Sequence, residues 1–293
     1  MVHWVAVRPA YQRKGLGKAI ATQLAMEGTD VMFTSRDAEQ LEIAREQVLR
    51  DARGRVESCP CDITKADEIE ALVAVTRERL GPIDILINNA GGPPGGGFDQ
   101  VDDAAWQAAF ELNLLSYVRL IRNVLPDLKE NGGRIINVTS ASIKQPIPGL
   151  ILSNVFRMGI LGMAKTLADE LAPYNILVNT VAPGRIATDR TAYLDEFNAR
   201  KRGITREQVA AEARARAGSN GRSECHWIQS VTAPAGMVPG VLERLVDQAH
   251  SNCPSSSFSA NLTSLAVIVS VLWTNPASNA LSARALMSRG TPA

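Results

Sequence analysis

The sequence is poor in metal-binding side chains and has no long apolar run. It contains four cysteines and three histidines in 293 residues. None of these cysteines forms a C-x-x-C pair and the histidines lie far apart, so we predict structural thiols in a reducing compartment. The longest apolar run, residues 265–273, is too short to span a bilayer. No secretory leader opens the chain, and we therefore predict a cytoplasmic protein without a membrane partner.

The chain also lacks an excess of either charge. Lys and Arg total 31 against 30 Asp and Glu, which gives a formal net charge of +1. No global field gathers nucleic acid or an anionic membrane, so any anion site must be local. At 45% hydrophobic and 21% charged residues, the chain can bury the core of one domain.

The apolar pattern alternates between the periods of strands and helices. Strands are expected at residues 2–7, 31–35, 55–62, 83–88, 134–138 and 176–181. Helices are expected at residues 15–26, 38–50, 67–80, 104–128 and 154–171. Because the strands are almost wholly apolar and alternate with helices, the pattern predicts an α/β fold with a doubly wound parallel sheet, Rossmann-like, in a single domain.

This pattern divides the chain at residue 217. Residues 1–217 form the expected Rossmann-like domain, with residues 1–14 as an atypical first strand and turn. Residues 185–217 are charged and helix-prone, as expected of a segment over a cleft. Residues 218–293 lose the alternation and form an atypical C-terminal segment, which we expect to be poorly ordered.

Two motifs directly follow expected strands, and a third lies in the expected helix between them. The fourth strand ends in Asn88-Asn89-Ala90-Gly91, and the fifth leads into a serine-rich turn at Ser140. Asn113 lies between them in Glu111-Leu-Asn-Leu-Leu115. In order and spacing these residues resemble the short-chain dehydrogenase/reductase family, and the stretch 145–150 resembles its 3-oxoacyl-carrier-protein reductases. The resemblance implies a dinucleotide cofactor at the carboxyl ends of the strands.

The resemblance places the cofactor on the turns that follow successive strands. Arg36 after the second strand favours NADP over NAD, because a guanidinium can bind the 2′-phosphate. The residues implied to bind the cofactor are Gly15, Leu16, Gly17, Arg36, Asp62, Ile63, Asn89, Ala90, Gly91, Pro183, Gly184 and Thr188. Tyr11 stands where the family has the leading glycine of its first turn, which puts the usual pyrophosphate cradle in question.

The catalytic positions depart from the family pattern. Family members place Tyr-x-x-x-Lys thirteen residues after the serine, and this chain has Ser153 and Arg157 there. Ser140 and Asn113 occupy the positions that bind the substrate oxygen and a relay water. Ser153 is a weaker and shorter acid than a phenol, and Arg157 can hold a ribose but cannot pass a proton along a relay. The proton donor is therefore missing.

Two tyrosines offer alternative proton donors. Tyr193 lies in the presumed lid, and Tyr117 lies one helical turn past Asn113. For each of them, a half-buried structural aromatic is the favoured interpretation.

Both ends of the chain depart from the family. Residues 12–17, Gln-Arg-Lys-Gly-Leu-Gly, resemble the acyl-CoA-binding turn of GCN5-related acetyltransferases, whose other strands are absent. After Ala217 the last family motifs are missing, although residues 265–273 could form a seventh strand. We expect these ends to derive from a shifted reading frame or recombination, which resequencing would test.

Two functions remain open from the residues alone, and acyl-CoA binding through the opening turn is a third, less favoured hypothesis. The first is NADP(H)-dependent reduction of a carbonyl, such as a 3-oxoacyl thioester or similar ketone, with Ser140, Asn113, Ser153 and Arg157 at the reaction site. The second is a catalytically silent dinucleotide-binding or interaction protein. The expected partner is a small-molecule carbonyl or acyl substrate and no nucleic acid. A homodimer and a homotetramer are both compatible with the resemblance.

Overall fold

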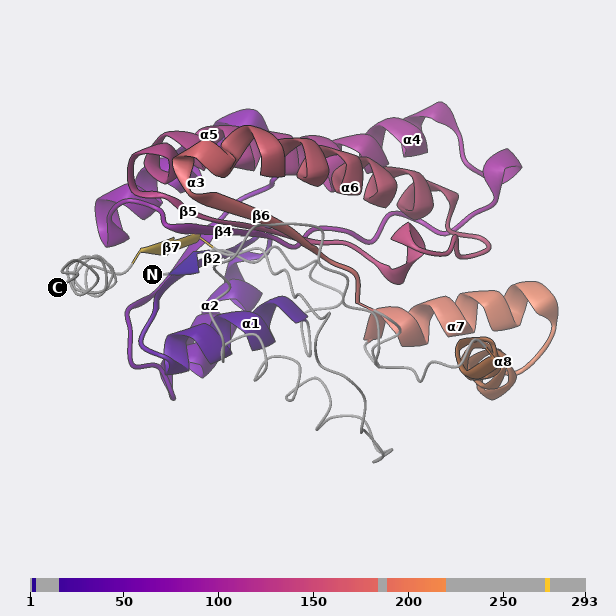
Figure 1. Cartoon of the computed structure of the whole chain (residues 1–293). Helices are drawn as coiled ribbons and strands as arrows, with labels where there is room; N and C mark the ends of the chain where they lie inside the picture. Colours follow the sequence, from indigo (N-terminus) through magenta and orange to yellow (C-terminus); the bar gives the residue numbers. More distant parts are fainter. Residues whose placement is uncertain (1, 4–15, 184–188, 220–271, 275–293) are drawn as a thin grey trace, which may run out of the picture.

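The structure is a computed structural model that describes residues 2–3, 16–183, 189–219 and 272–274. A central sheet lies between two layers of helices (Figure 1), with α3 to α6 over one face and α1 and α2 over the other. The strands are β1 (Val2–His3), β2 (Asp30–Ser35), β3 (Val56–Pro60), β4 (Ile85–Asn88), β5 (Gly133–Val138), β6 (Ile176–Val181) and β7 (Leu272–Thr274). The longer helices are α1 (Leu16–Met26), α2 (Ala38–Leu49), α3 (Ala66–Leu80), α4 (Asp103–Phe110), α5 (Ser116–Asn131), α6 (Ile151–Leu171), α7 (Asp189–Arg202) and α8 (Arg206–Ser219).

The sheet has the order β1-β2-β7-β4-β5-β6, and β3 also pairs with β2. Strands β4, β5 and β6 pair in parallel, as do β1, β2 and β3. The α/β class and the doubly wound, Rossmann-like sheet predicted from the sequence are confirmed. The short strand β7, whose direction was not predicted, pairs antiparallel with both β2 and β4.

The helix layers bury one apolar cluster on each face of the sheet. The cluster under α3, α5 and α6 includes the fully buried Leu72, Leu120 and Ile160. The cluster under α1 and α2 includes Ile20 and Leu41. Burial on both faces explains why the strands read as continuous apolar runs in the sequence.

The helix expected at residues 104–128 is not one regular helix. It is interrupted by a π-helical turn, η3 (Glu111–Leu115), between α4 and α5. Asn113 Nδ2 donates to the Ala109 carbonyl at 2.9 Å, and Ser116 Oγ donates to the Leu112 carbonyl at 2.7 Å. These side chains donate to backbone carbonyls where the α-helical pattern is interrupted. Apolar periodicity in the sequence does not reveal such an interruption.

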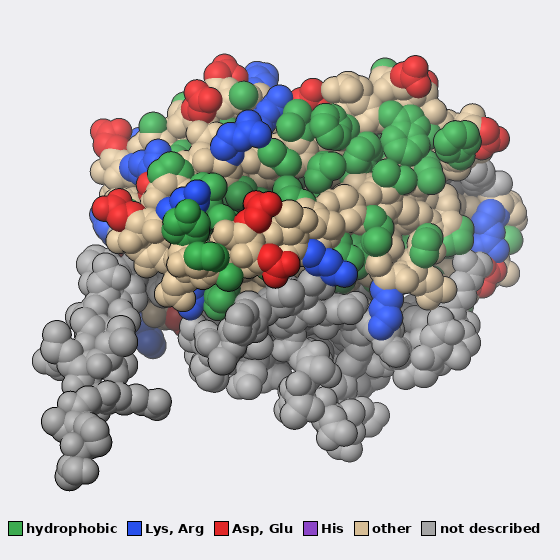
Figure 2. Space-filling view, turned by 45° about the horizontal axis from the view of Figure 1, so that its top comes forward, with side chains coloured by type: hydrophobic (Ala, Val, Ile, Leu, Met, Phe, Trp, Pro, Cys, Tyr) green, Lys and Arg blue, Asp and Glu red, His purple; other side chains and the backbone are tan. Residues whose placement is uncertain are grey.

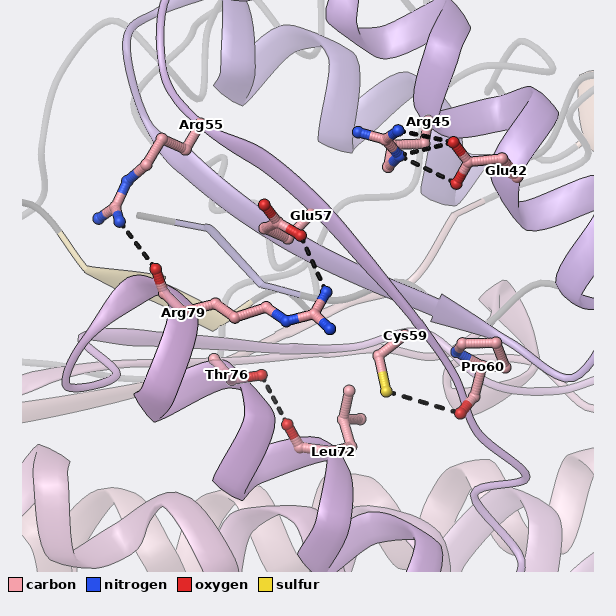
Figure 3. Close-up of polar contacts among 9 residues, drawn as sticks. All are labelled: Glu42, Arg45, Arg55, Glu57, Cys59, Pro60, Leu72, Thr76 and Arg79. Atoms are coloured by element: carbon pink, nitrogen blue, oxygen red, sulfur yellow. Dashed lines mark hydrogen bonds and ion pairs between the residues drawn. The ribbon is translucent and has the colours of Figure 1, made fainter.

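Charged side chains of α2, β3 and α3 form ion pairs (Figure 3). Arg79 pairs with Glu57 at 3.1 Å, and Arg45 pairs with Glu42 at 2.6 Å. Arg55 also donates to the Arg79 carbonyl at 2.8 Å. The Arg55 and Arg79 side chains are about half exposed and that of Arg45 is 31% exposed, so water screens the ion pairs and each stabilises the fold by little.

The ends of the chain are described only in part. Of the strand predicted at residues 2–7, the structure describes β1, and residues 4–15 lie outside the described residues. Of the atypical segment 218–293, it describes the end of α8 and β7. The domain boundary at residue 217 therefore stays a prediction. Within the described residues, no helix has the length and apolar character needed to cross a membrane.

Candidate functional site

The turn after β4 is held by buried polar contacts. Asn88 Nδ2 donates to Asn137 Oδ1 of β5 at 2.9 Å, and both asparagines are fully buried. Ala90 is buried as well, and its N–H donates to the hydroxyl of Tyr117 at 2.9 Å. The Asn-Asn-Ala-Gly motif thus leaves the sheet in a conformation that its neighbours specify.

Tyr117 joins this turn to the end of β5. Its ring is fully buried, and its hydroxyl donates to the Val138 carbonyl at 2.9 Å while accepting the Ala90 N–H. This hydroxyl therefore forms hydrogen bonds with the backbone at the ends of both β4 and β5. The structural interpretation of Tyr117 agrees with these contacts, although the ring is more deeply buried than the expected half-buried aromatic.

Arg157 reaches the same place from α6. Only 7% of the residue is exposed. Nη2 donates to the Ala90 carbonyl at 2.5 Å, and Nη1 donates to the Val138 carbonyl at 2.9 Å and the Tyr117 hydroxyl at 3.2 Å. Both terminal nitrogens are therefore engaged by protein atoms. The ribose contact implied for Arg157 by the resemblance stays a prediction.

Gly91 makes room for this guanidinium. A Cβ atom at residue 91 would lie 1.8 Å from Arg157 Nη2, and the residue has φ +156. The same Cβ would lie 3.3 Å from Asn113 Oδ1. Gly91, Asn113 and Arg157 are therefore neighbours, and a side chain at residue 91 would collide with the arginine.

Ser140 lies where β5 leaves the sheet. The Thr139 N–H donates to the Val181 carbonyl at 2.7 Å, and the Ala141 N–H donates to the Pro183 carbonyl at 2.9 Å, so Ser140 and Pro183 lie on adjacent turns. Ser140 Oγ accepts the Ser142 N–H at 3.2 Å. Because this contact uses a lone pair, the hydroxyl hydrogen of half-buried Ser140 can still be donated to a substrate oxygen.

Ser153 lies in the first turn of α6, one helical turn before Arg157. Its side chain is half-buried, and α6 packs against the turn Ala141–Ile143 that follows Ser140. Among the described residues, no hydrogen-bond partner orients the Ser153 hydroxyl or lowers its proton affinity. This position supplies no general acid comparable to a phenol.

The turns after β2 and β3 form the other side of the candidate site. Arg36 is exposed, directly after β2, and forms no ion pair within the described part of the chain. Asp62 Oδ1 accepts the N–H and hydroxyl of Thr64 at 3.1 and 2.8 Å. Ile63 is 3% exposed and belongs to the core, so only its backbone faces the turn.

The two described cysteines, Cys59 and Cys61, are free thiols beside these turns. Burial, the largest cause, raises the pKa of both thiols, and for Cys61 the Glu68 carboxylate adds to the shift. Thiols with a raised pKa are poor nucleophiles, in agreement with the structural role predicted for them.

Several expected site residues lie outside the described residues: Tyr11, Gly15, Gly184 and Thr188. Leu16 and Gly17 are described and begin α1, where Gly17 is buried. Nothing is described of the Tyr193 side chain in α7. The pyrophosphate and nicotinamide roles of these positions stay predictions.

Sequence reasoning missed the polar contacts that join β4 to β5. Asn137 interrupts the apolar run of β5, and an amide inside a buried strand is the one signal that could have revealed its bond to Asn88. The multiple bonds of Arg157 had no such signal, because they depend on three separate elements.

Comparison with known proteins decides the family. The model of the short chain dehydrogenase family matches residues 12–199, well over half of the chain. This chain belongs to the short chain dehydrogenase family. A curated relative described as a putative ketoacyl reductase, from Streptomyces coelicolor, is 37% identical over 185 residues, which cover 62% of this chain and 70% of the relative.

Two further family members widen the comparison. The D-beta-hydroxybutyrate dehydrogenase of Rhizobium meliloti is 34% identical over 200 residues, 68% of this chain and 78% of that protein. The crystal structure of a variant of actinorhodin polyketide ketoreductase with NADPH aligns with a TM-score of 0.69 at 29% identity. It covers 86% of this chain and 90% of the ketoreductase. The fold and the family of oxidoreductases are thereby shown.

Proposed function

We propose that this protein binds NADP(H) and reduces a small carbonyl compound, a 3-oxoacyl thioester or a similar ketone. The observation that carries the proposal is the convergence of retained family residues at the carboxyl ends of β4 and β5. Gly91 and Asn113 lie side by side, and Ser140 follows on the adjacent strand with its hydroxyl hydrogen available.

The described residues fit a phosphorylated dinucleotide. The Arg36 guanidinium is exposed and free of ion pairs within the described residues, as a contact to a 2′-phosphate requires. The turn from Asn89 to Gly92 presents backbone and little side chain, so a flat ligand can approach it closely. When bound, NADPH supplies the hydride that reduces the carbonyl carbon.

Ser140 and Asn113 perform the protein's part in this chemistry. The Ser140 hydroxyl donates a hydrogen bond to the carbonyl oxygen, where negative charge develops during reduction, and solvent water supplies the proton that converts the alkoxide to the alcohol. Asn113, fixed by its bond to the Ala109 carbonyl, positions the π-helical turn beside Gly91 and holds the relay water. Asp62, Ile63, Pro183, Gly184 and Thr188 complete the proposed cofactor contacts, and Gly15, Leu16 and Gly17 face its pyrophosphate.

The names of the relatives support an acyl or ketone substrate. One relative is described as a putative ketoacyl reductase, another is a D-beta-hydroxybutyrate dehydrogenase, and a structural neighbour is a polyketide ketoreductase with NADPH. These descriptions share a carbonyl or hydroxyl on an acyl chain or polyketide. We extend this substrate class to the present chain as part of the proposal.

A second candidate function is a catalytically silent NADP(H)-binding protein. The contacts of Arg157 favour it, because both terminal nitrogens of its guanidinium are engaged by protein atoms rather than turned to the cleft. Ser153 provides no acid of suitable strength beside Ser140. In this reading the nucleotide controls association with a partner rather than undergoing reaction.

Binding and turnover separate these functions. We expect NADPH to raise the melting temperature and to bind at micromolar concentration, and we expect NADPH absorbance to fall slowly with a panel of 3-oxoacyl thioesters and ketones. The Ser140→Ala variant should bind NADPH as the wild type does and lose the turnover. NADPH binding without turnover would support the silent protein. Absence of NADPH binding would reject both functions. A melting temperature raised by acetyl-CoA and not by NADPH would favour acyl-CoA binding through residues 12–17.

An apolar surface supports assembly into a homodimer or homotetramer. Apolar side chains gather over α4 and α6 (Figure 2), where Val155 and Met158 are 44% and 48% exposed. Phe156 packs edge-on against Trp106, with ring centroids 5.7 Å apart. We propose that this surface is covered by a second copy, which sedimentation of the purified protein would test. Cytoplasmic localisation stays a prediction.

A further inference from the structure

Arg157 lies in an unusual environment for a charged side chain. It is almost fully buried, and no carboxylate pairs with it among the described residues. Its described partners are two backbone carbonyls and a phenol hydroxyl, and its Nε atom has no acceptor among the described residues. Burying a charge without a carboxylate partner is costly. The hydrogen bonds of the Arg157 guanidinium must therefore offset part of this cost.

These hydrogen bonds join three elements at one point. Nη2 binds the Ala90 carbonyl after β4, and Nη1 binds the Val138 carbonyl at the end of β5 and the Tyr117 hydroxyl of α5. Tyr117 in turn accepts the Ala90 N–H. The peptide groups of Ala90 are thus fixed on both sides, the N–H by the tyrosine and the carbonyl by the arginine.

From this geometry we propose that Arg157 is a positioning residue for the nucleotide-facing turn Asn89–Gly91, acting together with Tyr117. The guanidinium holds the backbone of the turn against β5, and the turn then presents Asn89 and Gly91 to the nucleotide. A planar fork can reach two carbonyls at once, whereas an ammonium is shorter and has a single centre. The inference rests on the proposed function only where it concerns nucleotide affinity.

Hydrogen exchange tests the positioning without any ligand. In Arg157→Met and in Tyr117→Phe, we expect the Ala90 amide to exchange roughly tenfold faster or more, because each variant loses three hydrogen bonds that hold this turn. Val124→Ala is the matched control, because Val124 is fully buried in the same helix α5 and makes none of these contacts. Unchanged exchange in both variants, or an equal increase in the control, would overturn the proposal.

Nucleotide affinity tests the consequence of positioning. We expect Arg157→Met and Tyr117→Phe each to raise the Kd of NADPH about 5- to 20-fold. In the double variant, the fold-increase in Kd should be smaller than the product of the two single increases. Arg157→Lys should retain part of the affinity. The Val124→Ala control should bind as the wild type does, although it is less stable.

The pattern of these results distinguishes the competing explanations. Loss of affinity in Arg157→Met with wild-type affinity in Tyr117→Phe would show a direct nucleotide contact by the arginine and overturn positioning. Loss in all variants including the control would show a general effect of stability and overturn it as well. If the wild type binds no NADPH, the proposed function fails, and the hydrogen-exchange result alone decides the role of Arg157.

Discussion

The two sides of the candidate cleft are held together by different forces. On the β4–β5 side, buried amides, a phenol and a guanidinium fix the turns. On the β2–β3 side, the turn after β3 is held by the carboxylate of Glu68, which accepts the Asp62 N–H and pairs with the exposed Lys65. Buried polar networks are costly to alter, and exposed pairs contribute little. Sequence change is therefore tolerated more easily on the β2–β3 side, where the cofactor's phosphate is expected.

This difference also explains how the catalytic corner could change without loss of the fold. Ser153 is half-buried and makes no described hydrogen bond, so its identity affects chemistry more than stability. Arg157 and Tyr117 both donate to the Val138 carbonyl at the end of β5. The hydrogen bonds of Arg157 and Tyr117 therefore do not depend on the side chain at residue 153.

The largest effect on stability is expected at Arg157. Arg157→Met should lower the free energy of unfolding by about 3 kcal/mol, because two buried carbonyls lose a charged donor. Arg79→Met on the β2–β3 side should cost less than about 1 kcal/mol, since the Arg79 side chain is half exposed and water screens its ion pair with Glu57. Urea unfolding of both variants measures the difference, and similar losses would contradict the contrast between the two sides.

A somewhat smaller effect is expected on the affinity for NADPH at Arg36, on the β2–β3 side. Arg36→Ser should weaken NADPH binding about 30-fold, roughly 2 kcal/mol, and leave NADH binding unchanged. Arg50→Ser is the control, because this exposed arginine follows α2 at its opposite end. Titration calorimetry with both nucleotides measures the effect, and equal weakening of NADPH and NADH would refute the role of Arg36.

The cap of α2 should contribute less. Asp37 Oδ1 accepts the Gln40 N–H at 3.0 Å. Asp37→Ala should lower the free energy of unfolding by about 1 kcal/mol, and Asp37→Asn should retain most of it. A thermal or urea melt that shows the same loss for both variants would mean that charge, rather than the cap, matters here.

The smallest effect concerns pH. The Asp62 N–H and the Lys65 ammonium donate to Glu68, and they lower the pKa of this carboxyl from 4.5. A lowered folded-state pKa stabilises the fold above pH 4.5, and the contribution is lost as the pH falls through the folded-state pKa. The urea midpoint of wild type should exceed that of Glu68→Gln at pH 7, and the gap should close at pH 3. A gap that widens in acid would contradict this sign.

The sequence predicted the strands and most helices because apolar periodicity reports burial directly. It located the strand β6 and the motif at Asn88, which depend on short-range pattern. It did not predict the π-helical turn at Asn113 or the antiparallel strand β7, because side-chain bonds to carbonyls and long-range pairing leave no periodic signal. The arrangement of Arg157, Tyr117 and Ala90 depends on three elements distant in sequence, and only the fold brings them together.

We propose that the candidate site keeps its contacts for the cofactor and the substrate oxygen and lacks a proton donor at residue 153. The most direct test is the rate of NADPH oxidation by Ser153→Tyr against wild type on a panel of ketones and 3-oxoacyl thioesters, with Ser153→Phe as a control of equal bulk. A restored phenol should raise turnover by about 10²-fold or more, and Ser153→Phe should not. A Ser153→Tyr protein that binds NADPH but turns over no faster than the wild type would contradict the claim.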